Sequence, residues 1–241
     1  MKKLLLGCLC ILIFGCVTLI KPKHVHKQVC WLGETKVIIQ KEDFGPGKTF
    51  VHVHANETTA LDAARHVAQA EGGHVITLVH AKQRDIHFRY HGKDYSFDPN
   101  RIYTAQGIKK TLLAHGCYDK KSERIVARFA HQVLANIPRG KIIAVHNNKG
   151  YSCRDYLPKH ELANDAVKLY LQNDSHYRNF FLVTKAGDFY RLKNSGFNVV
   201  HQAIHVCDDG SMSVALRKRH YINVEAAFGE LHTQMNMIRH A

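Results

Sequence analysis

The sequence lacks the short motifs that mark several common classes of enzyme and binding protein. It contains no C-x-x-C pair, which removes support for a zinc ribbon or a thioredoxin-like redox site, and no G-x-S-x-G nucleophile elbow. The segment HELAN (160–164) begins like an H-E-x-x-H zinc helix, but Asn164 stands where the second histidine would be. Internal repeats and long low-complexity segments are also missing, so solenoid and fibrous architectures are excluded.

Acidic residues are scarce relative to basic ones. The chain has 34 lysines and arginines against 20 aspartates and glutamates, a formal net charge of +14. Such a charge favours polyanionic surroundings, which are nucleic acid, anionic lipid or an acidic cell wall. Apart from the run RKRH (217–220) the basic residues are scattered, and no helix-turn-helix, zinc-finger or RNA-binding aromatic motif accompanies them. We therefore predict a solvated basic surface and no nucleic-acid partner.

The first twenty residues have the pattern of an export segment. Lys2 and Lys3 precede an uncharged apolar run, which is typical of a secretory signal peptide. The run is close to the lower length limit of a membrane-spanning helix, so an uncleaved anchor is an alternative. IFGC, which ends at Cys16, resembles a bacterial lipobox, so a lipoprotein tethered to the membrane through Cys16 is another. In each case the folded part is expected outside the cytoplasm, whether periplasmic, secreted or membrane-anchored.

The remaining chain is long enough for one compact domain with a substantial core. We predict an export segment over residues 1–20, a polar linker over 21–35 and a single domain over 36–241. Four cysteines follow the export segment, and an oxidising compartment would allow one or two disulfides among them, with buried free thiols as the alternative. They are Cys30, Cys117, Cys153 and Cys207.

Apolar strands alternate with amphipathic helices along the predicted domain. This alternation predicts an α/β fold with helices on both faces of a central sheet, that is, a three-layer α/β/α arrangement around a mixed, mostly parallel sheet. Strands are expected at 36–40, 49–53, 74–80, 141–146, 179–184, 197–202, 213–217 and 221–225, with a hairpin over 85–97. Helices are expected at 57–73, 122–137, 161–172 and 226–238.

Polar side chains stand at the ends of three of the apolar strands. His54, His146 and Glu225 are in these positions, where open α/β sheets build their sites. Glu57 follows His54 by three residues, across the junction of strand and helix, so both side chains can reach one ion. Zinc enzymes commonly use two histidines and one glutamate and leave the fourth position for water. His52 lies on the same strand face as His54 and is expected to support the site rather than bind the metal.

The order of four separate elements resembles the zinc carboxypeptidase and aspartoacylase/succinylglutamate desuccinylase superfamily. The elements are H-x-x-E at 54–57, FDPNR at 97–101, the strand-ending His146, and INVE, which ends at Glu225. The resemblance covers roughly Thr49 to Ile238, and D-x-N-R is its most distinctive part. It implies a zinc-exopeptidase-like fold with one Zn²⁺ per chain. His54, Glu57 and His146 would be the ligands, and Glu225 the general base.

The same resemblance assigns a second group of residues to the substrate. Asn100 and Arg101 would grip the free carboxylate of the substrate, because a planar guanidinium binds a carboxylate in a two-pronged manner. An upstream arginine would polarise the scissile carbonyl, and Arg84 has the more carboxypeptidase-like distance from Asn100, with Arg89 as the competitor. Tyr151, a few residues after His146, is expected to line the pocket, although a loop role is equally open.

These residues predict an exported zinc metallohydrolase, a carboxypeptidase-like amidohydrolase that cleaves an amide next to a free carboxylate. Bacterial cell-wall stem peptides are the expected substrate, on the grounds of export and basic charge. Two alternatives stay open: a deacylase of N-acyl amino acids like the aspartoacylases, and a non-catalytic basic binding protein with the same fold. Glu225 is followed by Ala-Ala-Phe-Gly rather than the glutamate-glycine pair of several members, which weakens any transfer of a specific substrate.

Overall fold

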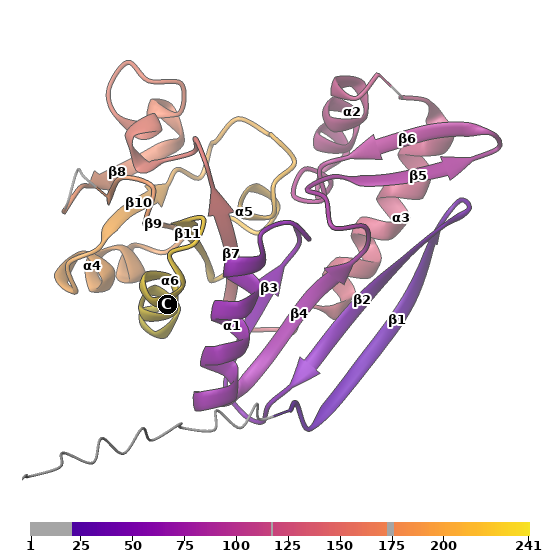
Figure 1. Cartoon of the computed structure of the whole chain (residues 1–241). Helices are drawn as coiled ribbons and strands as arrows, with labels where there is room; N and C mark the ends of the chain where they lie inside the picture. The colour runs from indigo at the N-terminus through magenta and orange to yellow at the C-terminus, as the bar shows by residue number, and fades with distance from the viewer. Residues whose placement is uncertain (1–20, 117, 173–175) are drawn as a thin grey trace, which may run out of the picture.

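A mixed sheet of nine strands runs through residues 21–116, 118–172 and 176–241, which this computed structural model describes (Figure 1). The predicted export segment, with Cys16, lies outside the described residues, as does Cys117. In order across the sheet the strands are β1 (His24–Leu32), β2 (Thr35–Asp43), β4 (Gly73–Val79), β3 (Lys48–His52), β7 (Ile142–Asn148), β11 (Tyr221–Ala227), β9 (Phe180–Val183), β10 (Asn198–Gln202) and β8 (Ala166–Tyr170).

Most of the strands run in one direction. The pairs β4–β3, β3–β7 and β7–β11 are parallel, and they form the centre of the sheet. Antiparallel pairings turn β2, β9 and β10 against the other six strands. The prediction of a mixed, mostly parallel sheet is confirmed. Its consequence is that β3, β7 and β11 end at the same edge, where the polar residues of the sequence motifs lie.

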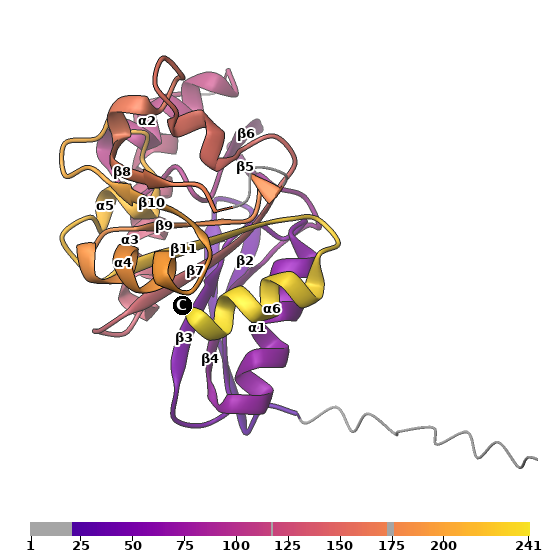
Figure 2. The ribbon, with the colours of Figure 1, turned by 90° about the vertical axis from the view of Figure 1, so that its left-hand side faces the viewer.

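Helices cover both faces of the sheet, as predicted (Figure 2). Two hydrophobic cores, one on each face, hold them there. One face packs against α1 (Thr58–Glu71), α4 (Ala186–Asn194) and α6 (Leu231–His240). The other packs against α2 (Ala105–Ala114), α3 (Lys120–Asn136), the short α5 (Met212–Ala215) and the hairpin β5 (Ile86–Tyr90)–β6 (Lys93–Phe97).

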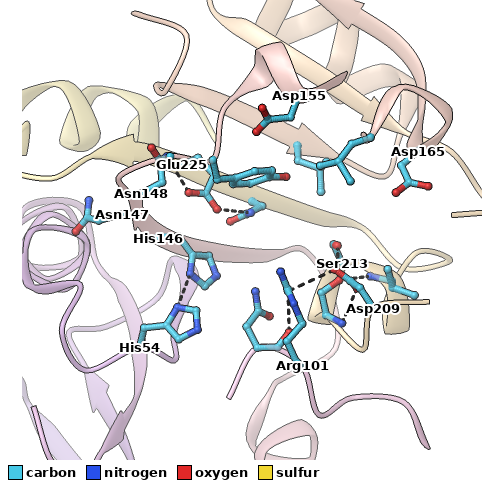
Figure 3. A pocket seen from close by; sticks show the side chains of 18 of the residues that line it. His54, Arg101, His146, Asn147, Asn148, Asp155, Asp165, Asp209, Ser213 and Glu225 are labelled. Carbon is cyan, nitrogen blue, oxygen red and sulfur yellow. Dashed lines mark hydrogen bonds and ion pairs between the residues drawn. The ribbon is translucent and has the colours of Figure 1, made fainter. Parts of the chain in front are cut away.

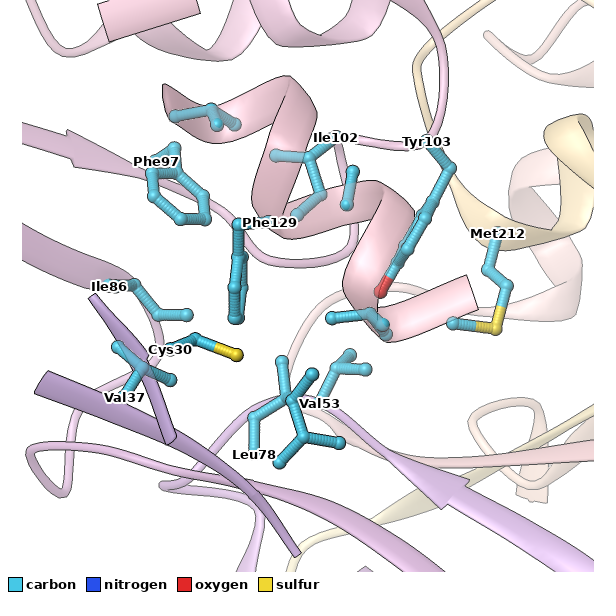
Figure 4. Close-up of a cluster of buried hydrophobic side chains, with 14 of the residues drawn as sticks. Cys30, Val37, Val53, Leu78, Ile86, Phe97, Ile102, Tyr103, Phe129 and Met212 are labelled. Atoms are coloured by element: carbon cyan, nitrogen blue, oxygen red, sulfur yellow. The ribbon is translucent and has the colours of Figure 1, made fainter. Parts of the chain in front are cut away.

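The pleat of β7 explains how one strand serves both cores. Ile143 and Val145 lie in the core under α1 and α6, whereas Ile142 and Ala144 lie in the core under α3. The core under α3 is rich in aromatic rings, and the ring centroids of Phe97 and Phe129 within it are 6.2 Å apart (Figure 4). Since alternate residues share a face, His146 continues the α3 side of β7, beyond the point where apolar packing stops.

The segment 21–35 is not a linker, and that prediction is wrong. Residues 24–32 form β1, which pairs with β2 along its whole length. The polar composition of the segment misled the prediction, because most of β1 is exposed and only Cys30 and Leu32 at its end enter the core. The domain therefore includes β1 in its sheet rather than beginning at residue 36.

Two further predicted elements have the opposite conformation. The helix expected over 161–172 is a single 3₁₀ turn, η2 (Ala163–Asp165), followed by β8, because residues 166–170 add to the sheet edge beside β10. The strand expected over 213–217 is the short helix α5, which begins after Ser211, whose hydroxyl accepts a hydrogen bond from the Val214 amide. A second 3₁₀ turn, η1 (Cys153–Tyr156), follows β7.

The closing helix α6 begins five residues later than predicted, since β11 continues to Ala227. Helices α2 and α4 were not predicted from the sequence. Cys30, Cys153 and Cys207 are free thiols in this structure. Among the described helices, none is long and apolar enough to cross a bilayer.

Candidate metal centre and active site

The candidate site lies at the carboxyl ends of β3, β7 and β11. His54 comes two residues after β3, and Glu57 is the residue that precedes α1. His146 lies in β7 and stands directly opposite Glu225 of β11 in the parallel register. All four side chains are buried, with between 1% and 5% of their surface exposed. Three segments far apart in the sequence thus bring four polar side chains together inside the protein.

The nitrogen and oxygen atoms of His54, Glu57 and His146 face one another. The Nδ1 atom of His54 lies 2.8 Å from Oε1 of Glu57, and Nδ1 of His146 lies 3.0 Å from Oε2 of the same carboxylate. The two Nδ1 atoms are 3.2 Å apart (Figure 3). Within the described residues, these three form the one group whose donor atoms converge as a metal site requires.

This donor set fits a single zinc ion. Ligand atoms about 2.0–2.1 Å from a tetrahedral zinc are about 3.3 Å apart, close to the separations seen here. His54 also contacts Asp98, whose Oδ1 lies 2.8 Å from its Nε2. With the proton on Nε2 and donated to Asp98, the lone pair of Nδ1 is free for a metal, which is the usual arrangement of a metal-binding histidine. The structure therefore brings the three predicted ligands together in a form that suits one zinc.

The charges of the ligand group depend on one another. Burial alone would lower the pKa of His54, but the carboxylates of Glu57 and Asp98 outweigh it and raise that pKa to about 9. Burial opposes ionisation of Glu57, yet His146 and His54 hold the pKa of its carboxyl well below the usual range. Without a metal, His54 is thus a cation between two carboxylates at neutral pH. A zinc ion would take the place of that proton.

Two further contacts hold the ligand carboxylate and its turn. His52, fully buried, lies 2.9 Å from the Thr77 hydroxyl and 3.1 Å from the backbone oxygen of Glu57. Burial lowers the pKa of His52 to about 4, so it is neutral and supports the Glu57 backbone rather than joining the donor set. The Asp98 carboxylate accepts a hydrogen bond from the backbone N–H of Asn100 at 2.7 Å, and it also contacts His54. Asp98 thus joins the turn at 98–100 to the ligand group.

Glu225 is held by two amides on its own face of the sheet. Nδ2 of Asn148 donates to its Oε2 at 3.1 Å, and Nδ2 of Asn223 donates to its Oε1 at 3.0 Å. Burial raises the pKa of the Glu225 carboxyl above its usual value. The side-chain oxygens of both asparagines are buried and have no hydrogen-bond partner. Such oxygens are costly in a core, so two of them beside one carboxylate indicate a site built for something other than stability.

Sequence reasoning missed these two asparagines. The pattern that could have found them is alternation: Asn148 is two residues after His146, and Asn223 is two residues before Glu225. In strands that are otherwise apolar, polar residues at alternate positions share one face. They therefore point to the same site as the residues that the motifs identified.

Of the two arginines left open by the sequence, Arg84 is the one at the site. Its Nη1 lies 2.9 Å from Oε1 of Glu57 and its Nη2 3.1 Å from Oδ2 of Asp98. Arg89 lies on the exposed hairpin, 4.0 Å from Asp94, and does not line the cavity. Arg84 thus neutralises the carboxylates around His54. Its predicted contact with the scissile carbonyl stays a prediction.

Asn100 and Arg101 lie on the side of the cavity facing α5. Nη1 of Arg101 lies 3.1 Å from the Asn100 carbonyl oxygen and 3.5 Å from Oδ2 of Asp209 (Figure 3). The Asn100 side-chain oxygen accepts the Met212 amide at 3.2 Å. The ion pair of Arg101 with Asp209 is long and more than one-third exposed on both sides, so an incoming carboxylate can replace it.

Tyr151 belongs to an aromatic wall on the opposite side. Its hydroxyl is hydrogen-bonded to that of Tyr156, and its ring centroid lies 5.2 Å from that of Phe180. Burial raises the pKa values of both hydroxyls, so they stay protonated.

All eight predicted site residues line one cavity of about 680 Å³. Figure 3 shows His54 and His146 at one end, Arg101 at its side, and three further carboxylates around the rest of the space. The three labelled there are Asp155, Asp165 and Asp209, and Glu161 also lines the cavity. A chain with a large excess of basic residues has thus gathered several of its few acids around this cavity.

No family model matches the chain, and no curated protein matches it by sequence. Among solved structures, an aspartoacylase family protein from Mesorhizobium loti aligns with 92% of this chain and 67% of its own, at 14% identity and a TM-score of 0.43. A bromoperoxidase from Bacillus anthracis aligns with 49% of this chain and 34% of its own, at 17% identity and a TM-score of 0.23. The first protein belongs to a group that the sequence resembles. At these values neither similarity bears on activity, so the interpretation of the site rests on its own geometry.

Proposed function

We propose that this chain is a zinc-dependent hydrolase that cleaves an amide bond next to a free carboxylate, as a carboxypeptidase does. The observation that supports this most directly is the convergence of His54, Glu57 and His146 in one cavity with a buried glutamate outside the donor set and an arginine at the side. Amide hydrolysis needs an activated water, a proton shuttle and a means to hold the substrate. The three-residue donor set, Glu225 and Arg101 are placed to provide these three requirements.

The residues divide the chemistry among them. A zinc ion held by His54, Glu57 and His146 would act as a Lewis acid and lower the pKa of a bound water to about 7. Glu225 can accept a proton from water and return it to the leaving nitrogen, because burial raises the pKa of its carboxyl and makes the carboxylate a stronger base. Asn148 and Asn223 hold both oxygens of Glu225, so the carboxylate is oriented before the substrate arrives.

Arg101 provides the preference for a free carboxylate. Arg84 is engaged by two carboxylates, whereas the contacts of Arg101 among the described residues are a long one with Asp209 and one with a backbone oxygen. A guanidinium in this state can form paired hydrogen bonds to a substrate carboxylate. Arg101 therefore sets the distance from the carboxylate to the metal group, and with it the bond that is cleaved.

Export and a cell-wall substrate are part of the proposal. The sequence of residues 1–20 supports export, and the net charge of +14 supports work close to an anionic polymer such as a bacterial cell wall. We accordingly propose peptidoglycan stem peptides as the substrate. Deacylation of N-acyl amino acids would use the same metal ligands, the same proton shuttle and the same arginine for the substrate carboxylate, and it is the alternative activity.

The test begins with metal content. The protein purified without chelator should contain one zinc per chain by mass spectrometry, and the His146→Ala variant should contain none. The zinc-loaded protein is then incubated with muropeptides and, separately, with N-acyl amino acids, and the released amino acids are quantified. Glu225→Gln serves as the inactive control, since it removes the proton shuttle and keeps the donor set.

The outcomes separate the three functions. Release of a terminal amino acid from muropeptides alone supports the carboxypeptidase, and release from N-acyl amino acids alone supports the deacylase. Stoichiometric zinc without hydrolysis of either set would favour a binding protein. Substoichiometric zinc that His146→Ala leaves unchanged would contradict the metal centre itself.

A further inference from the structure

One face of the sheet is left open beside its N-terminal edge. Along β1 the alternate residues Val25, Lys27, Val29 and Trp31 share a face, and all four are exposed. We call this surface the β1 outer face. It continues onto β2 through the residues in register with it, which are Lys36, Ile38, Gln40 and the buried Glu42, and onto β4 through Val79.

Only from Cys30 onward is the exposure of β1 confined to one side, because His24 and His26 are exposed on the reverse of the strand. On the reverse of the same strands, Cys30, Leu32, Val37 and Ile39 are buried in the core under α3. On the open side α1 lies over β3, β4 and β7 (Figure 1) and reaches β2 through Arg65, whose guanidinium is paired with Glu42. Around Val29 and Trp31 the β1 outer face is therefore uncovered, while the reverse of the sheet at that level is packed against the core.

The residues of this face combine an aromatic ring, branched apolar side chains and lysines. Trp31 is the one tryptophan of the chain, and 64% of its side chain is exposed. Val25 and Val29 are each 46% exposed and Val79 is 40% exposed. Register places Lys36 opposite Trp31, and Lys27 lies between the two valines. Indole rings prefer the level of lipid headgroups, and lysines beside them are attracted to anionic headgroups.

The place of this face in the chain points to the same occupant. β1 begins at His24, four residues after the uncharged apolar run that ends at Ile20, and four extended residues span roughly 13 Å. Lys21 and Lys23 lie in this interval. A bilayer that holds the apolar run is therefore within reach of β1. A single hydrophobic anchor commonly needs a second, basic or apolar signal for stable attachment, and the β1 outer face supplies both.

We propose that the β1 outer face docks on an anionic lipid bilayer, with Trp31 at headgroup level and Lys27 and Lys36 against the phosphates. The catalytic cavity stays free in this orientation, because β2, β4 and β3 lie between β1 and β7. The proposal does not depend on the hydrolase activity. In this arrangement the folded domain itself contacts the membrane surface, instead of being attached to it through the N-terminal segment alone.

The single tryptophan makes the test direct. The full chain is placed in nanodiscs of phosphatidylcholine with or without phosphatidylglycerol, and the emission of Trp31 is recorded with lipids brominated near the headgroup or near the chain end. We expect a blue shift and strong quenching by the headgroup-proximal bromines in the anionic discs. The shift should weaken with added salt and in the Lys27→Glu/Lys36→Glu variant.

A matched reporter controls for nonspecific contact. Val167 of β8 is 58% exposed at the opposite edge of the sheet, so in the Trp31→Phe/Val167→Trp variant the indole should keep the emission of a solvated ring. Equal quenching of both reporters would overturn the proposal, as would unshifted Trp31 emission in discs that carry the protein, or failure of the chain to associate with discs. A blue shift without lipid that grows with protein concentration would show a second copy on this face and would also overturn it.

Discussion

The two faces of β7 and β11 have the same backbone but opposite side chains. Toward α1 and α6, alternate residues such as Ile143 and Ile222 pack in a dry core. Toward the cavity, the two strands present His146, Asn148, Asn223 and Glu225, which are nearly as buried. One face contributes to stability through apolar burial. The other buries a carboxylate, an imidazole and two amide oxygens without a hydrogen-bond partner.

The polar face has the features of a functional site rather than of a stabilising core. Buried polar groups without full hydrogen bonding reduce stability, and natural proteins concentrate such violations at functional sites. The polar groups where the two faces meet, by contrast, have their hydrogen-bond partners. Asn147, which faces the apolar side next to His146, accepts the Ala60 amide at 2.8 Å and donates to Gln234, which in turn donates to the His146 carbonyl oxygen at 2.9 Å. The core face thus fixes the backbone on which the polar face depends.

The largest expected effect comes from removing a ligand on the polar face. His146→Ala should abolish zinc binding, because two donors remain where tight binding needs three. The adjacent Val145→Ala, on the apolar face, should keep one zinc per chain. Mass spectrometry of the purified proteins measures both. Equal zinc contents in the two variants would contradict the division between the faces.

Glu225→Gln should keep zinc and reduce turnover on the order of a hundredfold or more, because the amide cannot shuttle a proton. The fold should tolerate it, since the unpartnered oxygen of Asn148 or Asn223 can turn to accept from the new amide. Steady-state rates together with metal content provide the measurement. Val224→Ala, one residue earlier and on the apolar face, is the control, and normal hydrolysis by Glu225→Gln would remove Glu225 from the mechanism.

Arg101→Lys should raise KM by about ten- to a hundredfold with a smaller change in kcat, because an ammonium replaces two parallel hydrogen bonds with one contact. The measurement compares a substrate that has a free carboxylate with the same substrate amidated at that position. The substitution should matter only for the free acid. An equal loss for both would mean that Arg101 acts on the structure of the site rather than on the substrate.

Zinc binding at pH 7 should release about one proton per ion, since His54 has a pKa of about 9 in the metal-free protein and must lose its proton to bind. Titration calorimetry in buffers of different ionisation enthalpy measures this number. The same raised pKa stabilises the metal-free fold fully below pH 6.5, and this contribution is lost as the pH rises through about 9. Zinc uptake without proton release would show that His54 is already neutral.

The smallest effect on the site should come from Ile143→Ala, in the apolar core. It should cost about 2–5 kcal/mol of unfolding free energy through lost burial and a cavity. Zinc stoichiometry and KM should stay unchanged in the folded fraction. Denaturant unfolding and metal analysis of the same sample measure both, and a loss of zinc without a loss of stability would show that the faces are not independent.

Much of the fold could be predicted because it depends on local pattern. The apolar runs that became β3, β4, β7 and β11 are identifiable in the sequence, and so is the helix after Glu57. The failures occur where pairing outweighs local preference. Residues 166–170 have helix-forming neighbours, yet β10 draws them into the sheet. β1 looks like a linker since most of it is exposed on both faces, and only Cys30 and Leu32 at its end enter the core.

The sequence by itself identified four residues of the candidate site, because spacing and strand ends point to His54, Glu57, His146 and Glu225. Tertiary structure alone decided between Arg84 and Arg89, since only a folded chain shows which guanidinium reaches the Glu57 carboxylate. It also brought Asn148 and Asn223 to either side of Glu225. The reason is physical: residue type and periodicity are local properties, whereas a hydrogen bond between β7 and β11 exists only once residues 77 positions apart lie side by side.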